Sequence, residues 1–491
     1  MAKIPASVDT KVISGLEIYR KGKVRNTYFL PSELELLLSF ATDRISIFDF
    51  VLPTVVPFKG EGLTALNIFW RKNVLGDLVT HDLVAYGVDI DQYLSEDLRG
   101  IPELQKRALV IRKLDMLPVE AVVRGYLTGS GLTAYRKDSV ICGHALPEGL
   151  DDGAELPYPI FTPTTKAEEG HDEHVDADSV CKKHGFAIER ASLQLYELAR
   201  RFARDRGIVL ADTKFEFGRE KHSELVLCDE VFTPDSSRFW DLKAWQESRT
   251  KRSSPPSLDK QYVRNEGKRL GVDKRDPLVA GDDEWVHRLE FSPEVVEMTT
   301  RIYRYGFWRL AGKKLEAFQR ADMGIAVRMP PVHVHVVLGS ESDRDQAQNG
   351  LNWLGIDTPP EVTAELDIIS CHRNPEELRR FAETVREDSV IIAGAGKAAA
   401  LPGVLQSWLK YFGKGHIPVL GVAFDGGTDE ANRAARLSIE QLPGNPVILA
   451  PGGIAYFGSE GFLNACGAAI VNEFFVTPTP TKEAKHNVPL V

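Results

Sequence analysis

Leu210-Ala211-Asp212-Thr213-Lys214-Phe215-Glu216-Phe217-Gly218 alternates charged with apolar residues. Successive side chains of an extended strand point to opposite faces, so Asp212, Lys214 and Glu216 are expected to share one face. The apolar residues between them favour the other face. A short polar turn follows, and Leu225-Val226-Leu227 then reads as a second strand. The stretch therefore predicts a β-hairpin that presents a row of charges.

We predict that this hairpin pairs Lys214 with Asp229, which brings Glu216 and Asp229 onto one face. Two carboxylates beside a lysine suit a hard cation such as Mg²⁺, which shares oxygen ligands with substrate phosphates. The alternative is a solvated outer face of an edge hairpin. Because the face carries both signs of charge, we favour a metal site at Glu216 and Asp229. We assign catalytic roles to Asp212 and Lys214.

The composition is that of a globular protein, with 491 residues of which 43% are hydrophobic and 26% charged. This length predicts two or three domains. The net charge of -10 argues against a general nucleic-acid binder. Five scattered cysteines without a CxxC pair predict a reduced, cytoplasmic protein without a zinc or disulfide framework. We expect no signal peptide and no membrane partner, because no apolar run approaches about 20 residues.

Two stretches near the N-terminus are predicted to face a ligand. Lys21-Gly22-Lys23-Val24-Arg25 is a basic turn between strands, and its glycine permits close approach of a polyphosphate. An ordinary soluble turn is the alternative. A buried strand from Leu34 to Ala41 ends in polar residues that include Asp43 and Ser46, which are expected to bind substrate. Their alternative role is to cap turns. A helix is expected from about Leu63 to Lys72.

A second candidate anion site follows the strand expected over residues 119–126. Leu127-Thr128-Gly129-Ser130-Gly131 leads into a helix and offers free backbone N–H groups and a hydroxyl. Arg124 suits a carboxylate or phosphate. An ordinary N-cap by Ser130 is an alternative that is compatible with anion binding. Arg238, in the turn after the hairpin, is expected within reach of Asp229.

Residues 1–320 are expected to form one domain, residues 321–331 a linker and residues 332–491 a second domain. Helices are expected from Ala187 to Asp205 and from Ser292 to about Leu310. The run from Glu168 to His174 combines acidic residues with two histidines. Both a metal site and a surface loop are consistent with this run.

Beyond residue 331 a pattern of strand, glycine- or serine-rich turn and helix repeats. Strands are expected near 334–338, 366–369, 390–392, 418–422 and 446–450. The pattern predicts a three-layer α/β sandwich with a parallel sheet. Ligands in such folds lie beyond the carboxyl ends of the strands, where Gly339-Ser340, Ser370–Arg373 and Ala393–Lys397 fall. We expect one phosphate-binding pocket in which His372 moves a proton. A purely structural histidine is the alternative.

Residues of about 10–290 resemble the bacterial and fungal type of SAICAR synthetase (phosphoribosylaminoimidazole-succinocarboxamide synthase). The matching stretches are KGKVRNTY (21–28), TDRISIFD (42–49), VEAVVRGYLTGSG (119–131), PIFTPTTKAEEGHDE (159–173), ADTKFEFG (211–218), DEVFTPDSSRFW (229–240) and DKQYVR (259–264). The resemblance implies an α+β domain of two sub-lobes that uses ATP and Mg²⁺ to condense a carboxyaminoimidazole ribonucleotide with L-aspartate. It also implies that ATP lies against Lys21, Gly22, Lys23 and Arg25, that Glu216 and Asp229 hold Mg²⁺, and that Arg124, Ser130 and Arg238 bind the nucleotide or aspartate.

Residues of about 332–475 resemble the PurE family of aminoimidazole ribonucleotide carboxylases and mutases. The matches are GSESD (339–343), SCHRNPEEL (370–378), AGAGKAAALPG (393–403) and SIEQLPGNPV (438–447). The resemblance implies a flavodoxin-like sheet, no metal or organic cofactor, and a homo-octamer. It implies a ribonucleotide site at Ser340, Ser342, Asp343, Ser370 and Arg373, with His372 as proton shuttle.

One loop departs from the PurE pattern. Ala400 stands where histidine is usual, and Lys397 is an added cation that we expect to contact substrate, either a carboxylate or CO₂. The two resemblances together predict a bifunctional purine-synthesis enzyme. Its second domain would make carboxyaminoimidazole ribonucleotide, from aminoimidazole ribonucleotide and CO₂ or from the N-carboxy form, for the first. One rival is that residues 332–491 are a scaffold or ribonucleotide sensor. Another is that the first domain is an amide ligase for a different amine.

Overall fold

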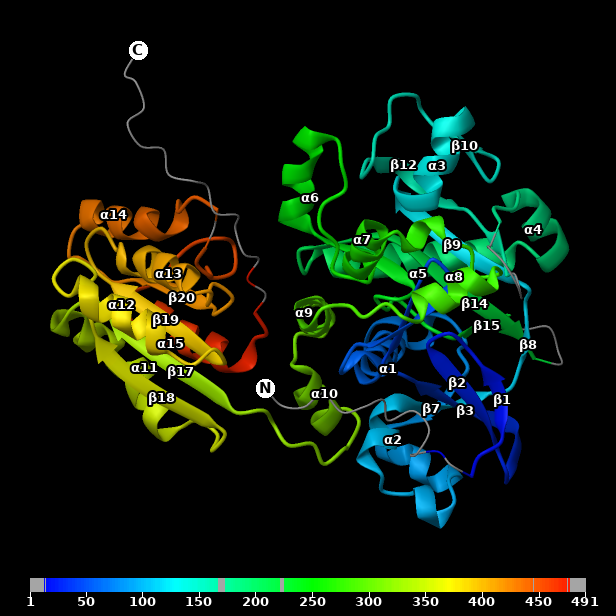
Figure 1. Cartoon of the computed structure of the whole chain (residues 1–491), viewed down its shortest axis with the longest axis horizontal. Helices are drawn as coiled ribbons and strands as arrows, with labels where there is room; N and C mark the ends of the chain where they lie inside the picture. The colour runs from blue at the N-terminus through cyan, green and yellow to red at the C-terminus, as the bar shows by residue number, and fades with distance from the viewer. Residues whose placement is uncertain are drawn as a thin grey trace. The chain divides into compact units, whose positions relative to one another are not determined.

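The computed structural model describes residue 13 and residues 15–166, 173–220, 225–444, 446–474 and 476. These residues divide into two compact units, which lie within 1–327 and 328–491 (Figure 1). The acidic and histidine-rich run from Glu168 lies largely outside the described residues, which resume at Glu173.

The first sheet of the N-terminal unit is antiparallel, with its strands in the order β1-β2-β3-β7-β6. The predicted basic turn joins β1 to β2, and the Gly22 N–H closes it by donating to the Arg25 carbonyl at 2.8 Å. Strand β3 is exposed at its start and buried from Leu37 to Ala41, so the polar residues that follow leave the core together. The strands are β1 (Ile18–Lys21), β2 (Arg25–Leu30), β3 (Glu33–Ala41), β6 (Leu83–Tyr86) and β7 (Ala108–Arg112).

The second sheet is organised around the long strand β14 (Ile208–Arg219), which pairs with four other strands. Its main path runs β12-β9-β14-β15, and three short strands flank this path. The other strands of this sheet are β8 (Asp115–Met116), β9 (Val119–Tyr126), β12 (Glu155–Phe161), β13 (Thr164–Thr165), β15 (Leu225–Cys228) and β16 (Ser237–Asp241), of which β12 and β13 pair with β9. Two smaller strand pairs complete the strands of this unit: β4 (Arg44–Ile47) with β5 (Phe50–Val55), and β10 (Val140–Ile141) with β11 (His144–Ala145).

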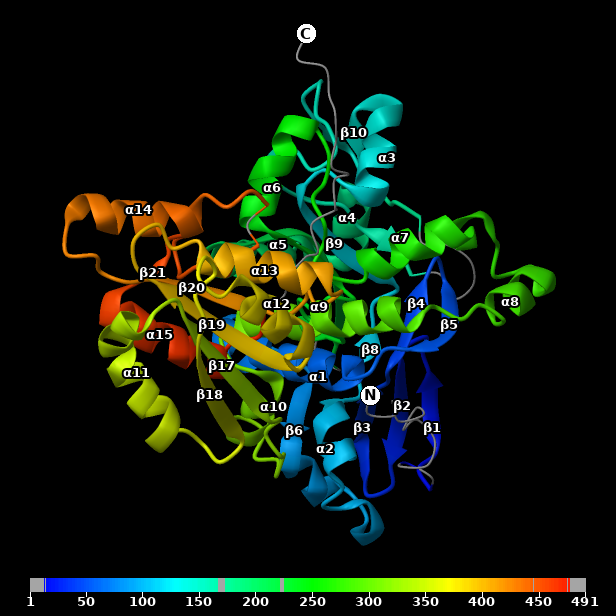
Figure 2. The same cartoon turned by 60° about the vertical axis from the view of Figure 1, so that its left-hand side comes forward.

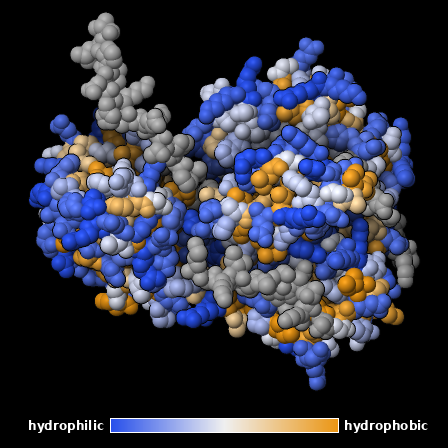
Figure 3. Space-filling view, in the orientation of Figure 1, coloured by the Kyte–Doolittle hydropathy of each residue, from blue (hydrophilic) through white to orange (hydrophobic). Residues whose placement is uncertain are grey.

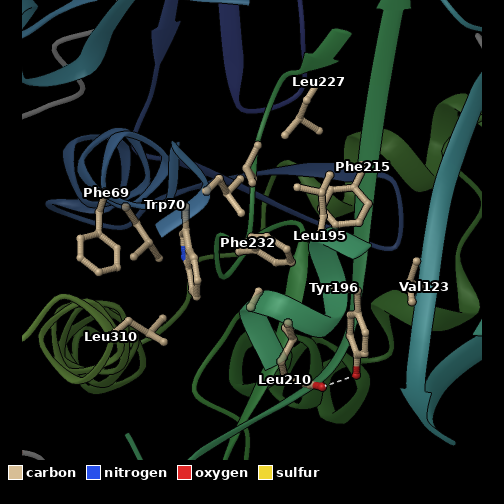
Figure 4. Packing of buried hydrophobic residues seen from close by; sticks show 14 of the residues in the cluster. Phe69, Trp70, Val123, Leu195, Tyr196, Leu210, Phe215, Leu227, Phe232 and Leu310 are labelled. Atoms are coloured by element: carbon tan, nitrogen blue, oxygen red, sulfur yellow. Dashed lines mark hydrogen bonds between the residues drawn. The ribbon is translucent and has the colours of Figure 1, made fainter. Parts of the chain in front are cut away.

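The alternation of β14 is confirmed. Phe215 and Phe217 are fully buried on the core face, whereas Asp212 and Lys214 are partly exposed on the other. Phe215 packs edge-on against Phe232 with ring centroids 5.1 Å apart (Figure 4). The Tyr196 hydroxyl donates to the Leu210 carbonyl at 2.6 Å and so anchors the predicted helix α5 (Ala187–Arg204) to the strand. Burying each aromatic side chain contributes about 1.5–3 kcal/mol, so this core fixes which face of β14 carries charge.

The predicted register of the hairpin is wrong by one residue. Pairing Lys214 with Asp229 would place Glu216 opposite Leu227. In the structure, Glu216 lies opposite Cys228. Strand β15 ends at Cys228, and Asp229 turns away with a left-handed φ of 54°. The side chain of Asp229 is therefore positioned by this turn and not by strand alternation.

The remaining elements of the N-terminal unit are helices, one of which begins away from its predicted position. Helix α1 begins at Lys59, not near Leu63, because the Gly60 N–H donates to Asp43 Oδ1 at 2.9 Å, and it continues into a π-helical segment over Trp70–Leu75. Helix α3 has Thr128 at its N-cap, so the alternative role of Ser130 as the N-cap is wrong. The helices are α1 (Lys59–Phe69), α2 (Pro102–Arg107), α3 (Gly129–Asp138), α4 (Ala177–His184), α5, α6 (Leu242–Ser248), α7 (Gln261–Leu270), α8 (Ala280–Val286), α9 (Pro293–Ala311) and α10 (Leu315–Ala321).

The C-terminal unit contains the predicted parallel sheet, with strands in the order β18-β17-β19-β20-β21. This order is consistent with a flavodoxin-like sheet. The fifth strand is Tyr456–Phe457, and the strand expected at 446–450 is wrong: Ile448 and Ala450 form only isolated bridges. The elements are β17 (Val332–Leu338), α11 (Arg344–Ile356), β18 (Val362–Ile368), α12 (Pro375–Thr384), β19 (Ser389–Ala395), α13 (Leu401–Tyr411), β20 (Val419–Ala423), α14 (Asp429–Glu440), β21 and α15 (Gly458–Val471).

Both faces of this sheet are covered by helices. Neighbouring residues of one strand enter different cores: Ile391 joins α12, α13 and α14, whereas Ile392 joins α11 and α15. Figure 2 shows the two groups of helices on opposite sides of the strands. A sheet buried on both faces explains why its strands read as continuous apolar runs.

Apolar side chains on the visible face of the molecule are interspersed among hydrophilic ones (Figure 3). Within the described residues, no helix is both long and apolar enough to span a membrane.

Candidate functional site

Asp212 stands at the centre of the charged face of β14, between two arginines. Arg124 on β9 and Arg238 on β16 are its direct cross-strand partners. Both guanidinium groups donate to Asp212 Oδ2, Arg124 at 3.0 Å and Arg238 at 2.6 Å. Burial and the nearby charge of Arg238 lower the pKa of Arg124, although Asp212 opposes the shift. The expectation that Arg238 reaches Asp229 is replaced by this pairing with Asp212.

The start of helix α3 lies against the same two arginines. Arg124 donates to the Ser130 hydroxyl at 3.0 Å and to Thr162 Oγ1 at 3.0 Å. A Cβ on Gly129 would lie 3.0 Å from Arg238, and one on Gly131 would lie 3.0 Å from Arg124. Glycine thus permits the arginines to lie close to the free N–H groups of the first turn. Backbone N–H groups, two guanidinium groups and a hydroxyl converge here as an anion-binding site.

Lys214, two residues along β14, lies among carboxylates. Its ammonium donates to Glu120 Oε1 on β9 at 2.5 Å. Burial acts to lower the pKa of Lys214, but the charges of Glu120, Glu216 and Asp229 outweigh it and raise that pKa. Glu216 pairs in turn with Lys166. Lys214 is therefore a fixed positive charge at neutral pH.

Glu216 and Asp229 are the residues predicted to hold Mg²⁺. Both lie close enough to Lys214 for their charges to raise its pKa. The Asp229 side chain is about 37% exposed, with Arg25 Nε at 3.8 Å from Oδ1. Within the described residues, no group of three or more His, Cys, Asp or Glu side chains is arranged as a metal site. Two carboxylate donors fit Mg²⁺, which commonly takes one or two carboxylates and completes its shell with water and phosphate oxygens.

The basic turn contributes to this region through Arg25. Its guanidinium donates to Glu230 Oε1 at 2.7 Å, and the charges of Glu230 and Asp229 raise its pKa despite its burial. Lys23 pairs with Asp49 at 2.6 Å, and Lys21 is exposed. Gly22 is crowded, since a Cβ there would lie 2.6 Å from the Arg25 carbonyl oxygen. The turn thus directs Arg25 inward and its two lysines outward.

Asp43 and Ser46, predicted to bind substrate, lie next to this region. Arg107 donates to both carboxylate oxygens of Asp43, at 2.6 and 3.0 Å, and the Gly60 N–H donates to one of them. Asp43 thus joins the end of β3 to helix α1. Ser46 lies in β4, opposite Val51.

A buried polar cluster that the sequence analysis did not identify lies nearby. Lys59, which is fully buried, donates to Asp235 at 2.6 Å, and the Tyr303 hydroxyl donates to the same carboxylate at 2.6 Å. The charges of Lys59 and Lys260 lower the pKa of Asp235 against the effect of burial. The sequence analysis did not identify Glu120 either. Its position in a strand that reads as a buried run could have indicated a functional carboxylate.

In the C-terminal unit the ends of three parallel strands bring the predicted residues together. Ser340 Oγ lies 2.7 Å from Ser342 Oγ and donates to Asp343 at 3.1 Å. Arg373 donates to the Gly339 carbonyl at 3.4 Å, which links the turn after β18 to the turn after β17. Burial raises the pKa of Asp343, while Ser340, the Gly396 backbone and Arg373 oppose the shift. The Arg373 N–H also donates to Ser370 Oγ at 3.2 Å.

His372 and Lys397 lie on two of these turns. His372 is exposed in the turn after β18, and Lys397 follows β19. A Cβ on Gly426 would lie 3.6 Å from Lys397 Cγ, so the turn after β20 also reaches the site. Ala400 precedes the first residue of helix α13. The sequence analysis did not include the turn at 425–428, although its paired glycines follow a strand as the other turns do.

Comparison with known proteins identifies both regions. The family model described as SAICAR synthetase matches residues 18–276, and the model described as AIR carboxylase matches residues 333–453. A phosphoribosylaminoimidazole-succinocarboxamide synthase from Streptomyces coelicolor is 44% identical over 312 residues, which cover 61% of this chain and 95% of that protein. One from Thermobifida fusca is 43% identical over 312 residues, covering 61% of this chain and 93% of that protein.

The fold agrees with these matches. A solved structure of SAICAR synthase from Saccharomyces cerevisiae, complexed with SAICAR, has a TM-score of 0.53 and 32% identity, and covers 63% of this chain and 99% of that one. The resemblance stated from the motifs is thereby confirmed. The chain belongs to the SAICAR synthetase family and carries an AIR carboxylase region fused behind its synthetase region.

Proposed function

We propose that residues 18–276 condense carboxyaminoimidazole ribonucleotide with L-aspartate at the expense of ATP. A carboxylate is a poor acyl donor, so its oxygen first attacks the γ-phosphorus of ATP, giving an acyl phosphate and ADP. The aspartate amine then attacks the acyl carbon and loses a proton, and phosphate leaves. The observation that carries this proposal is the charged face of β14, where Asp212 with its two arginines adjoins Lys214 with its carboxylates.

The residues of this face suit the separate parts of the reaction. The start of α3 with Arg124, Ser130 and Arg238 binds an anionic group of the ribonucleotide. Lys214 keeps its charge, because its pKa is raised, and offsets negative charge on the phosphoryl group in transfer. We assign Lys21, Lys23 and Arg25 of the basic turn to the polyphosphate of ATP, for which the two outward-facing lysines and Arg25 supply positive charge.

Glu216 and Asp229 would hold Mg²⁺ in this scheme. When bound, the ion would neutralise phosphate oxygens. Glu216 is kept in place by Lys166 and Asp229 by its backbone turn, whose carbonyl accepts from Arg71 at 2.6 Å.

Product analysis of the full chain tests this half of the proposal. The reaction with ATP, carboxyaminoimidazole ribonucleotide and L-aspartate should release ADP and phosphate and give the succinocarboxamide. Omitting aspartate, or replacing it with another amino acid, should stop product formation. Amide formation without aspartate would show instead a ligase with a different amine substrate.

For residues 333–453 we propose interconversion of aminoimidazole ribonucleotide and its carboxylated form. In the decarboxylating direction the bond from the ring carbon to the carboxyl carbon breaks, CO₂ leaves, and the ring carbon takes a proton from His372. The convergence of Ser340, Asp343 and Arg373 at the strand ends supports a ribonucleotide site there. ATP-independent loss of the ring carboxylate that disappears in His372→Asn tests this proposal.

A second candidate role for residues 333–453 follows from Lys397 and Ala400. A ribonucleotide-binding region without turnover would act as a sensor or as an assembly scaffold. It predicts that the ribonucleotide binds but keeps its carboxylate. Ribonucleotide binding with no carboxylate loss, in both the full chain and His372→Asn, would favour this role.

We also propose that the C-terminal region assembles into a homo-oligomer, with an octamer as the expected size. Tyr411, Ile454 and Val471 expose 75%, 53% and 58% of their surface, and contact with another copy of the chain would remove such apolar surface from water. Sedimentation of the full chain measures the assembly, and a monomer at micromolar concentration would contradict it.

A further inference from the structure

Two cations that the reaction scheme above does not use stand one turn apart on helix α7. Lys260 precedes the first residue of the helix, and the Arg264 N–H donates to the Lys260 carbonyl at 3.0 Å. Side chains four residues apart on a helix lie on the same face. Gly267, three residues beyond Arg264, lies against the strand β4, where an added Cβ would lie 2.3 Å from Ile47 Cδ1. The glycine therefore permits close packing of helix α7 on this strand.

No partner is found for either cation in the part of the chain that the structure describes. Within the described ranges, neither side chain makes a hydrogen bond or an ion pair, and the Arg264 Nε is completely buried without an acceptor. Both side chains are half-buried. Leaving a buried donor unsatisfied costs about 1–3 kcal/mol, and more for a charged group. Such a cost is typical of a group that is completed by a ligand.

The charges around the pair alternate in sign. Burial lowers the pKa of Lys260 to about 8, with Arg264, Lys59 and Lys214 adding to the shift and Asp235 opposing it. Burial likewise lowers the pKa of Arg264, with Arg238 adding to the shift and Asp259, Asp212 and Asp235 opposing it. The pair thus lies within electrostatic reach of both Asp212 and Lys214. Asp212 and Lys214 belong to the charged face of β14 on which the proposed synthetase function rests.

We propose that Lys260 and Arg264 bind the carboxylates of the dicarboxylic amino-acid substrate, an inference that rests on the synthetase function proposed above. Two cations match two carboxylates. Asp212 and Asp235 provide negative charge nearby for the amino group. A phosphate monoester has no positive group to match these carboxylates, and the start of α3 already offers it an anion site. The pattern of charge therefore fits a zwitterion with two carboxylates better than it fits the ribonucleotide phosphate.

Steady-state kinetics of full-chain Lys260→Gln and Arg264→Gln test the assignment. We expect the KM for L-aspartate to rise about tenfold or more in each, with the KM for ATP and for the ribonucleotide within about twofold of wild type. Arg264→Lys keeps the charge but loses the planar guanidinium group, so its KM for aspartate should lie between that of wild type and that of Arg264→Gln. Succinate, a dicarboxylate without the amine, should inhibit wild type competitively against aspartate and inhibit Arg264→Gln less.

Arg269→Gln is the matched control, because Arg269 lies on the same helix, is exposed, and pairs with Glu266 at 2.6 Å. Its kinetics should match wild type. Thermal unfolding supplies a second measure: removing an unpaired, half-buried cation should leave Tm unchanged or raise it, whereas removing a structural ion pair lowers it.

Two results would overturn the assignment. A raised KM for the ribonucleotide with an unchanged KM for aspartate would assign the cations to phosphate, as would inhibition by inorganic phosphate that is competitive against the ribonucleotide and lost in Arg264→Gln. A lower Tm with unchanged kinetics would make the pair structural. If wild type itself makes no aspartate-dependent product, the synthetase proposal fails. If wild type is active and the variants match it, this inference alone fails.

Discussion

Asp212 and Arg124 lie directly opposite each other on the antiparallel strands β14 and β9, and Arg124 Nη1 donates to Asp212 Oδ2 at 3.0 Å. Arg238 reaches the same oxygen from the other side. Asp212 thereby keeps two guanidinium groups close together that would otherwise repel each other. The carboxylate sets the spacing of the anion site and need not touch the ligand to do so.

Asp212→Asn should therefore damage both stability and binding. Leaving two largely buried arginines without their counter-charge should lower the free energy of unfolding by about 2–4 kcal/mol. It should also raise the KM for the ribonucleotide about tenfold or more. Chemical denaturation and kinetics measure the two effects, and the exposed Asp273→Asn is the control. Wild-type stability together with a wild-type KM would show that the arginines do not depend on Asp212.

The magnesium assignment predicts a loss of metal response in Glu216→Gln and Asp229→Asn. Each change removes one negative oxygen donor, so the Mg²⁺ concentration that gives half-maximal synthetase activity should rise about tenfold or more. Glu220→Gln is the control, because Glu220 is partly exposed just beyond the end of β14, where it pairs with Arg112. An unchanged Mg²⁺ response in both variants would remove the metal role from these carboxylates.

The lowered pKa of Lys260 predicts a pH dependence with a definite sign. Its folded-state pKa of about 8 lies below the unfolded value of about 10.4, so folding is penalised while the group is protonated and the penalty fades as pH rises from about 8 to 10. Lys260→Gln should therefore be more stable than wild type near pH 7, with the gap closing above pH 8. Urea unfolding of both proteins from pH 6 to 10 measures this. A gap that does not change with pH would show that Lys260 is not the titrating group.

Loss of the same proton should weaken binding of aspartate. If the Lys260 ammonium holds a carboxylate, the KM for aspartate should rise as pH passes about 8 in wild type. The profile of Lys260→Gln should be flatter, starting from its higher value. Equal slopes in the two proteins would contradict a carboxylate contact by Lys260.

Features of the fold that depend on neighbouring residues could be predicted from the sequence, whereas those that depend on contacts between residues far apart in the chain could not. Phe215 and Phe217 reveal the core face of β14, because alternation is local to a strand. The pairing of Asp212 with Arg124 and Arg238 joins residues 88 and 26 positions apart, so it depends on strand order, which local patterns do not encode. The hairpin register depends on the backbone turn at Asp229. Its positive φ could not be predicted from the sequence, because non-glycine residues seldom adopt one.

The same limit applies to the candidate sites. In the C-terminal unit the strand ends could be predicted to converge, since parallel strands share one carboxyl edge. The prediction of a strand at 446–450 was wrong, because an apolar run can lie beside a sheet and form only isolated bridges. Lys260 and Arg264 were visible in the motif DKQYVR, but their lack of partners becomes apparent only in three dimensions.

In the proposed function one chain carries out two reactions, and the product of the second region is the substrate of the first. A coupled assay tests it most directly: the full chain receives ATP, Mg²⁺, L-aspartate and bicarbonate with either aminoimidazole ribonucleotide or its carboxylated form, and formation of the succinocarboxamide is followed. Wild type should use both ribonucleotides, and His372→Asn should use only the carboxylated one, while His287→Asn, which alters an exposed histidine of the N-terminal unit, should match wild type. Equal use of aminoimidazole ribonucleotide by wild type and His372→Asn, or failure of wild type with the carboxylated ribonucleotide, would contradict the account.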